Sequence, residues 1–337
     1  MKRLISTICI TSLVCGAFAD DVDLAPLLTE EDTQEVVAQG PTLLTQPPAF
    51  AEFAQLPPPA LPPIHKSPLI SVGLSSLIPG LGHAYLGDTR TALGLFGGTC
   101  AGISAAVMSL MSGGVEHPAF NLSLFSAQAV WSYSVYAAYR DVRALNGASN
   151  YTYPMPTDTF SDVVTAPFRW SVMKKPEVWG GILGALALGT AVMYFGYPHE
   201  ARIQLPHLSA KDLSLHPAIA LPVAIGEESA FRGYMQSYLS ETFSPNVGLA
   251  VSSLAFGAVH IPNAMSLPQE ERWRYYSFSI PLITGLGAYL GWVTQRNHSL
   301  KESVAIHAWY DFVVMGIGAW ASQSVAGRSD FSMVIPF

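Results

Sequence analysis

Two adjacent carboxylates and an arginine lie in a stretch of the chain whose flanks are apolar, Gly226-Glu227-Glu228-Ser229-Ala230-Phe231-Arg232-Gly233. A charge near the middle of a bilayer costs roughly 2.5–3.5 kcal/mol on insertion scales, so such residues normally pair, face a wet interior and mark function. On a helix, Glu228 and Arg232 share a face and are spaced for an ion pair, whereas Glu227 points about a quarter turn away. A pair that only locks two helices together would leave Glu227 unexplained. We therefore interpret Glu227 as the freer base.

The composition is that of a polytopic membrane protein. Of the 337 residues, 50% are hydrophobic and only 12% are charged, and soluble domains have about 25% charged residues. The formal net charge of −7 is small for this length, and there is no basic tract, so we expect no nucleic-acid partner. Cys100 is the one cysteine outside the N-terminal segment, which leaves no intramolecular disulfide.

The N-terminus has the pattern of a secretory signal peptide over residues 1–19: two basic residues, an apolar run and Ala17-Phe18-Ala19 before two aspartates. We predict cleavage after Ala19, and an uncleaved anchor is the alternative. Residues 20–66 are acidic and rich in proline, and such a composition cannot bury enough apolar surface to fold. We predict a disordered, exported tether, which is either an inert spacer or a binding segment for an exported partner.

Apolar segments then predict an all-α fold with about eight transmembrane helices. They cover residues 69–86, 91–112, 119–139, 179–197, 217–239, 247–264, 276–295 and 303–322. Pro79-Gly80-Leu81-Gly82 interrupts the first segment, which predicts a kinked helix or a re-entrant turn. Alternate crossings from an exported tether place the polar stretch 145–176 in the cytoplasm, with eight basic residues inside and five outside.

The polar stretch 145–176 also predicts a boundary between two membrane domains. Residues 67–144 would form an accessory helical module, since Pro79-Gly80-x-Gly82-x-x-Tyr85-x-Gly87 resembles the connector of small two-helix membrane modules. Residues 177–325 would form the domain that carries the chemistry, and residues 326–337 a C-terminal tail.

Polar residues recur in two later spans, where Phe256 and His260, and then His307 and Asp311, are spaced four residues apart and share a helix face. A single histidine in an apolar helix is more often a packing residue than a catalyst. Two histidines, one aspartate and two glutamates on three of the last four spans instead favour a buried polar pocket, where a glutamate becomes a competent general base. The remaining histidines, among them His83, are interpreted as surface residues.

Three motifs, in this order and each on its own apolar helix, resemble those of the CPBP family of intramembrane proteases: Glu227-Glu228-x-x-x-Arg232, Phe256-x-x-x-His260 and His307-x-x-x-Asp311. The family includes the type II CAAX prenyl endopeptidases and bacterial relatives called Abi proteins. The resemblance covers residues 177–325. It implies that Glu227 and His260 hold and activate a water, and that Arg232 holds Glu228. It also implies that His307 and the residue at position 311 stabilise the oxyanion.

One position departs from the family pattern. Prenyl endopeptidases tend to have Asn where this chain has Asp311. An ionised carboxylate accepts hydrogen bonds but does not donate them, so we expect Asp311 to orient His307. The departure weakens the case for prenylated substrates in particular.

We therefore predict an intramembrane endopeptidase of the bacterial inner membrane, which cuts a peptide bond of a membrane-associated peptide or protein in or near the lipid bilayer. The expected catalytic residues are Glu227, Glu228, His260, His307 and Asp311, with Arg232 in a structural ion pair. We expect no cofactor, and the alternative is zinc bound by Glu227, His260 and His307. The chain has no His-Glu-x-x-His motif, which favours the metal-free reading.

Two other functions are compatible with a membrane chain of this kind. A non-catalytic member of the family would use the same charges as structural glue in a scaffold, a bacteriocin-immunity factor or an assembly partner. It would have little use for an unpaired Glu227, which favours the enzyme. A transporter is less favoured, because the chain shows no internal repeat of broken helices.

Overall fold

The computed structural model describes residues 65–197, 215 and 217–325 of the chain. Helices make up almost all of this part and no strand occurs in it, which confirms the predicted all-α fold. The predicted signal peptide, residues 20–64 of the predicted tether and the tail 326–337 lie outside the described residues.

The helices follow one another with short connections. In chain order they are α2 Pro68–Leu77, α3 Leu81–Leu86, α4 Thr89–Gly113, η2 Gly114–Glu116, α5 Pro118–Leu145, η3 Ala148–Asn150, α6 Phe160–Thr165, η4 Ala166–Phe168, α7 Trp170–Met173, α8 Pro176–Gly196, η5 Pro217–Ile219, α10 Ala220–Glu228, η6 Ser229–Gln236, α11 Ser237–Thr242, α12 Pro245–Val259, η7 Ile261–Ser266, α13 Arg272–Arg274, η8 Tyr275–Ser279, α14 Ile280–Asn297 and α15 Lys301–Val325. The stretches η6 and η8 are π-helical, and the other short η elements are 3₁₀ turns.

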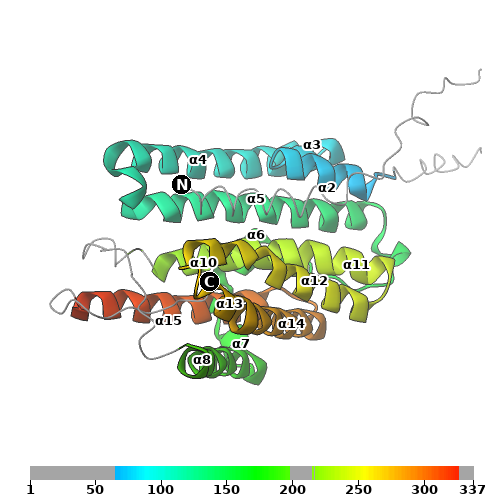
Figure 1. Cartoon of the computed structure of the whole chain (residues 1–337). Coiled ribbons are helices and arrows are strands. Elements are labelled where there is room, and N and C mark those ends of the chain that lie inside the picture. The colour runs from blue at the N-terminus through cyan, green and yellow to red at the C-terminus, as the bar shows by residue number, and fades with distance from the viewer. Residues whose placement is uncertain (1–64, 198–214, 216, 326–337) are drawn as a thin grey trace, which may run out of the picture.

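The long helices form layers (Figure 1). Helices α2 and α4 pack on one side of α5, and α10 with η6 pack on its other side. Helices α12 and α15 contact α10 or η6, α14 contacts α12 and α15, and α8 lies outermost against α14 and α15. Helix α5 therefore lies between the N-terminal helices and the helix that carries Glu227 and Glu228.

Close packing joins α5 to its neighbour. A Cβ atom added to Gly233 would lie 2.6 Å from the Tyr136 ring, so only glycine allows this approach. One cluster of buried apolar side chains contains Val72 and Tyr136 together with Tyr234 and Leu300. The hydrophobic core thus extends across the predicted domain boundary.

The first predicted span, 69–86, turns back on itself, which is the re-entrant turn predicted from the sequence as one of two possibilities. The count of eight spans stays a prediction. It forms α2 and α3, of 10 and 6 residues, with a turn at Gly80 in the left-handed region (φ 84°). Helix α2 is roughly 15 Å long, about half of what a bilayer requires. The backbone N–H of Ser67 donates to Tyr85 Oη at 3.1 Å, so the two ends of this hairpin lie together.

The other predicted segments each coincide with a long helix or a continuous helical run. Within the described part of the chain, α4, α8 and the run Pro245–Ser266 are long and apolar enough to cross a membrane.

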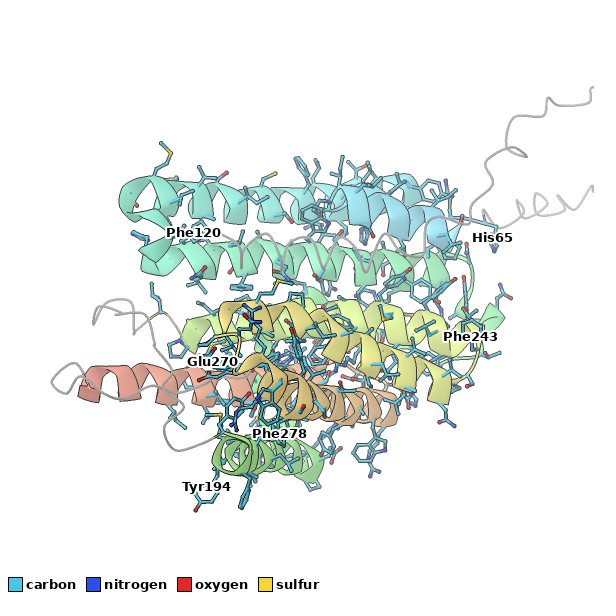
Figure 2. All side chains as sticks on the ribbon, viewed as in Figure 1. His65, Phe120, Tyr194, Phe243, Glu270 and Phe278 are labelled. Carbon is cyan, nitrogen blue, oxygen red and sulfur yellow. The ribbon has the colours of Figure 1, made fainter. Side chains whose placement is uncertain are left out.

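The start of α2 lies at the same end of the bundle as the end of α5. Lys66 N–H donates to Asn146 Oδ1 at 2.9 Å, and Asn146 Nδ2 donates to the Lys66 carbonyl oxygen at 2.8 Å. Figure 2 shows His65 and Phe243 at this end of the bundle and Glu270 toward the opposite end. An exported tether and a cytoplasmic stretch 145–176 are therefore incompatible, and one of these two predictions is wrong.

Cysteines introduced at His65 and Ser149, both exposed, should react with a membrane-impermeant maleimide from the same side of the membrane. The full-length protein in sealed vesicles, with its native cysteines replaced, is the sample. Glu270→Cys is the control, and we expect it to react only from the other side. Labelling of His65→Cys and Ser149→Cys from opposite sides would contradict the re-entrant hairpin.

The polar stretch 145–176 is folded onto both halves of the bundle. Asp158 Oδ2 accepts from the Leu300 backbone N–H at 2.6 Å, and Asp158 Oδ1 lies 2.9 Å from Lys301 Nζ, so this carboxylate caps the start of α15. The Asp158 carbonyl oxygen accepts from the Tyr136 hydroxyl on α5 at 3.3 Å. One residue thus ties α5 to the helix that carries His307.

Helix α6 begins with a reciprocal cap between Thr159 and Asp162. Hydrogen bonds from the Thr159 hydroxyl and backbone N–H lower the pKa of Asp162 to about 2. A lowered pKa means that the ionised carboxylate stabilises the folded protein. Because an unfolded aspartate has a pKa near 3.9, this contribution to folding stability is complete above that pH and is lost only as the pH falls toward 2. The cap is therefore charged throughout the physiological range.

His83 is fully buried, and our interpretation of it as a surface residue was wrong. Its Nε2 lies 3.2 Å from Asp141 Oδ2 on α5, and Arg140 contacts the same carboxylate. No local pattern indicates this pair, because the two residues are 58 positions apart.

Candidate functional site

The two glutamates end α10, and the same helix continues as η6 with wider, i to i+5 turns. All eight residues of η6 are buried. The Ser237 hydroxyl donates at 3.3 Å to the carbonyl oxygen of Arg232, five residues earlier. Such π-helical stretches are rare in proteins and occur frequently at functional sites.

Glu228 and Arg232 form the predicted ion pair. Arg232 Nη1 donates to Glu228 Oε1 at 3.0 Å, and both side chains are fully buried. Arg232 Nη2 donates to the carbonyl oxygen of Gly287 on α14 at 3.0 Å, and the guanidinium lies 4.1 Å from the centre of the Phe256 ring. Arg232 thus neutralises the Glu228 carboxylate, and the guanidinium itself is held by α14 and α12.

Glycines on α14 allow Arg232 and Gln236 to reach the backbone of that helix. A Cβ atom on Gly287 would lie 3.0 Å from the Phe256 ring and 3.1 Å from Arg232 Nη2. One turn later, Gln236 Nε2 donates to the Gly291 carbonyl oxygen at 3.0 Å. The four-residue spacing of Gly287 and Gly291 matches that of Arg232 and Gln236. This match is the one sequence signal that could have linked the two helices.

His307 joins α15 to the glutamate pair through a contact that the motifs do not indicate. Its Nδ1 lies 2.8 Å from Glu228 Oε1. Its Nε2 lies 3.3 Å from Asp311 Oδ2 and 3.9 Å from Glu227 Oε2. Ionised carboxylates only accept hydrogen bonds, so an imidazolium with a proton on each nitrogen satisfies both close contacts. Asp311 thus contacts His307, and Glu228 contacts it at shorter range.

His260 ends α12 with its tautomer fixed. Its Nδ1 lies 2.7 Å from the Phe256 carbonyl oxygen, which can only accept, so Nδ1 carries the proton. In a neutral ring, Nε2 then has a free lone pair. The Phe256 ring packs against both histidines, with ring centres 5.0 Å from His260 and 6.1 Å from His307.

The two glutamates differ in exposure to solvent. The Glu227 side chain is 21% exposed and Glu228 is 0% exposed. The Glu227 carboxylate lies beyond hydrogen-bonding distance of His307, whereas Glu228 is bonded to both Arg232 and His307. Glu227 is therefore the glutamate that a water or a substrate can reach.

A cavity of about 40 Å³ lies beside the polar groups, bordered by His260, His307 and Asp311. Its other walls are mostly apolar and come from α8, α12, α14 and α15: Gly181, Ala185, Phe256, Ile283, Leu286, Tyr289, Leu290, Ile306 and Tyr310. Asp311 Oδ1 is buried and has no hydrogen-bond partner within the described residues. The cavity thus combines an apolar body with a polar end.

The zinc alternative requires Glu227, His260 and His307 to share one ion. Both ring nitrogens of His307 face carboxylates, so His307 would have to release one of them to bind a metal. In the part of the chain that the structure describes, no three His, Cys, Asp or Glu residues are arranged to hold a metal ion. The predicted ligand set therefore does not fit zinc in this arrangement.

Comparison with known proteins gives one match. Residues 210–313 match the family model described as Type II CAAX prenyl endopeptidase Rce1-like. All three motifs lie within the matched region, which ends two residues after Asp311. No curated protein and no solved structure matches the chain significantly.

Proposed function

Because residues 210–313 belong to the CPBP family of intramembrane proteases, we propose that the chain is an endopeptidase that hydrolyses a peptide bond in or near the bilayer of the bacterial inner membrane. The observation that carries this proposal is the asymmetry of the glutamates. Glu228 is fully buried and bonded to Arg232 and His307, whereas the Glu227 side chain is 21% exposed and its carboxylate lies 3.9 Å from His307. A purely structural ion pair requires no such second carboxylate.

In the proposed reaction, Glu227 takes a proton from a water molecule whose oxygen attacks the carbonyl carbon of the scissile bond. The lone pair on His260 Nε2 accepts a hydrogen bond from the other O–H of that water and so orients it, while this hydrogen stays on the oxygen. When the tetrahedral intermediate collapses, the C–N bond breaks and protonated Glu227 returns its proton to the leaving amine. The products are a carboxylic acid and an amine, so the sequence of steps consumes one water.

The oxyanion of the intermediate needs a donor that is already in place. His307 Nε2 is that donor in our proposal, and its present contact with Asp311 Oδ2, at 3.3 Å, is longer than its 2.8 Å contact with Glu228. A substrate oxygen can therefore replace Asp311 at Nε2 while Glu228 still holds Nδ1. Asp311 acts as a positioning residue for the ring in this scheme.

We also propose that the end of the bundle that includes the stretch 145–176 is cytoplasmic. Most basic residues of the described part lie there, and basic residues favour the cytoplasmic side. They are Lys66, Arg90, Arg140, Arg143, Arg169, Lys174, Lys175, Arg296 and Lys301, whereas Arg272 and Arg274 lie at the other end. In this orientation the chain enters α2 from the cytoplasmic side. We propose it in place of the predicted exported tether.

The proposed activity is tested by comparing membrane peptides in cells that carry the wild-type chain or Glu227→Gln. Quantitative mass spectrometry should reveal cleavage products that are present with the wild type and absent with the variant, at equal protein levels. Identical peptide sets would favour a non-catalytic scaffold, an immunity factor or an assembly partner with the same fold.

We expect hydrolysis by the purified protein in detergent to survive strong chelators, because the proposed base is a carboxylate and no step uses a metal. The measurement is the rate at which a cleavable peptide is hydrolysed before and after dialysis against a chelator. Loss of activity on chelation, with recovery on addition of zinc, would overturn the metal-free mechanism.

A further inference from the structure

The cavity beside the candidate site has the position of a specificity pocket. His260, His307 and Asp311 border it together with apolar side chains. Two of them, His260 and His307, act directly in the proposed reaction, whereas Glu227 does not border the cavity. A side chain that enters the cavity would therefore belong to a residue near the scissile bond. This inference rests on the proposed function.

The size of the cavity limits what it can hold. One water molecule needs roughly 10–15 Å³ of such volume, so a cavity of about 40 Å³ has room for about three. A methyl or methylene group is similar in size to a water molecule. The cavity therefore fits the side chain of valine or leucine, whereas an isoprenoid chain is several times larger.

Helix α8 sets the capacity of the cavity on one side. A Cβ atom on Gly181 would lie 2.7 Å from Tyr289 and 2.9 Å from Ile306, so this position has no room for a larger residue. Gly189 is also close to its neighbour, since a Cβ atom there would lie 3.1 Å from Tyr310 Oη. Ala185, midway between them and buried, borders the cavity directly. A larger side chain at Ala185 would occupy the cavity itself.

We propose that this pocket binds an aliphatic side chain of valine or leucine size next to the scissile bond. The residue held by this pocket is accordingly an unmodified aliphatic one, not a prenylated cysteine. The polar end of the pocket suits this role, because the unpartnered Asp311 Oδ1 can accept a backbone N–H of the bound segment.

The test uses the purified full chain in proteoliposomes and a mixture of synthetic apolar peptides that vary in aliphatic and aromatic residues and include S-farnesyl-cysteine. Mass spectrometry of the products identifies the residues that flank each cleaved bond. We expect valine and leucine to dominate at one flanking position. Ala185→Leu should reduce cleavage at those sites about 10–200-fold, the range for a change of methylene size in an apolar pocket, and shift the preference to glycine and alanine.

Ala187→Leu is the matched control, because it makes the same change on the same helix at an exposed position. It should leave the preference unchanged. The melting temperature of Ala185→Leu should equal or exceed that of the wild type, since the added atoms fill empty space. A marked decrease would mean that the cavity has no room for them, which would overturn the pocket.

The outcomes separate the two proposals. Cleavage without an aliphatic preference, best cleavage at farnesyl-cysteine, or an unchanged preference in Ala185→Leu would overturn the pocket and leave the endopeptidase in place. A wild-type protein that cleaves none of the peptides, and releases no products in cells, would overturn the proposed function and the pocket with it.

Discussion

Glu227→Gln is expected to lower the turnover rate by about 10²–10⁴-fold, the usual contribution of a general base, and to leave the protein folded. The amide keeps the shape of the side chain but does not accept a proton at pH 7. Because Glu227 is partly exposed and lies 3.9 Å from His307, no buried charge is left unpaired by the change. Single-turnover rates on a cleaved peptide, with melting curves of both proteins, provide the measurement.

His260→Ala should produce a loss of similar size, and the double variant should be little slower than either single one. This follows because the two side chains act on one water, and residues that act as a unit give strongly non-additive effects. If the losses multiplied in the double variant, His260 and Glu227 would act independently, which would contradict the role of His260 in orienting the same water. Wild-type activity of Glu227→Gln would refute the assignment of the base.

Arg232→Ala is expected to destabilise the protein by about 3–5 kcal/mol, the cost of removing one partner of a buried ion pair. Glu228 is completely buried, and its Oε2 already has no hydrogen-bond partner within the described residues. His307 remains as a second partner of Glu228, so part of the charge stays compensated. Accumulation in membranes and the melting temperature in detergent measure the effect.

The matched control is Glu227→Ala, which removes the neighbouring carboxylate without leaving a charge unpaired and should accumulate almost normally. Glu228→Gln combined with Arg232→Met replaces both charges by neutral side chains of similar size and should restore part of the lost accumulation. Equal levels of Arg232→Ala and Glu227→Ala would show that the ion pair does not stabilise the bundle.

Contacts within one helix could be predicted from the sequence, since a spacing of four residues on a helix places two side chains together. The pairs Glu228 with Arg232 and His307 with Asp311 are of this kind, and the structure contains both. The bond from His307 to Glu228 spans 79 residues and depends on how α10 and α15 pack. No local pattern encodes that packing, so the most important contact of the site was not predicted.

Composition alone does not describe how the segments pack. The polar stretch 145–176 was interpreted as a boundary because of its composition, and its contacts were not predicted, since Asp158 caps the start of α15, 142 residues away. The segment 69–86 is apolar enough for a span, yet its proline and glycines turn it back after ten residues. The hydrophobicity of a segment indicates that its surroundings are apolar, but it does not predict whether the segment crosses the bundle or turns back.

The position of α5 limits how this protein can be shortened or recombined. Gly226 and Gly233 bring the helix that carries the glutamates into direct contact with Ala129 and Tyr136 of α5. A fragment that begins at residue 177 would retain every motif and the whole matched region. It would lose α5, which packs against the helix that carries the glutamates. We therefore expect the smallest fragment that folds on its own to be larger than the stretch that carries the three motifs. A chimaera that keeps activity has to exchange α5 together with its glutamate helix.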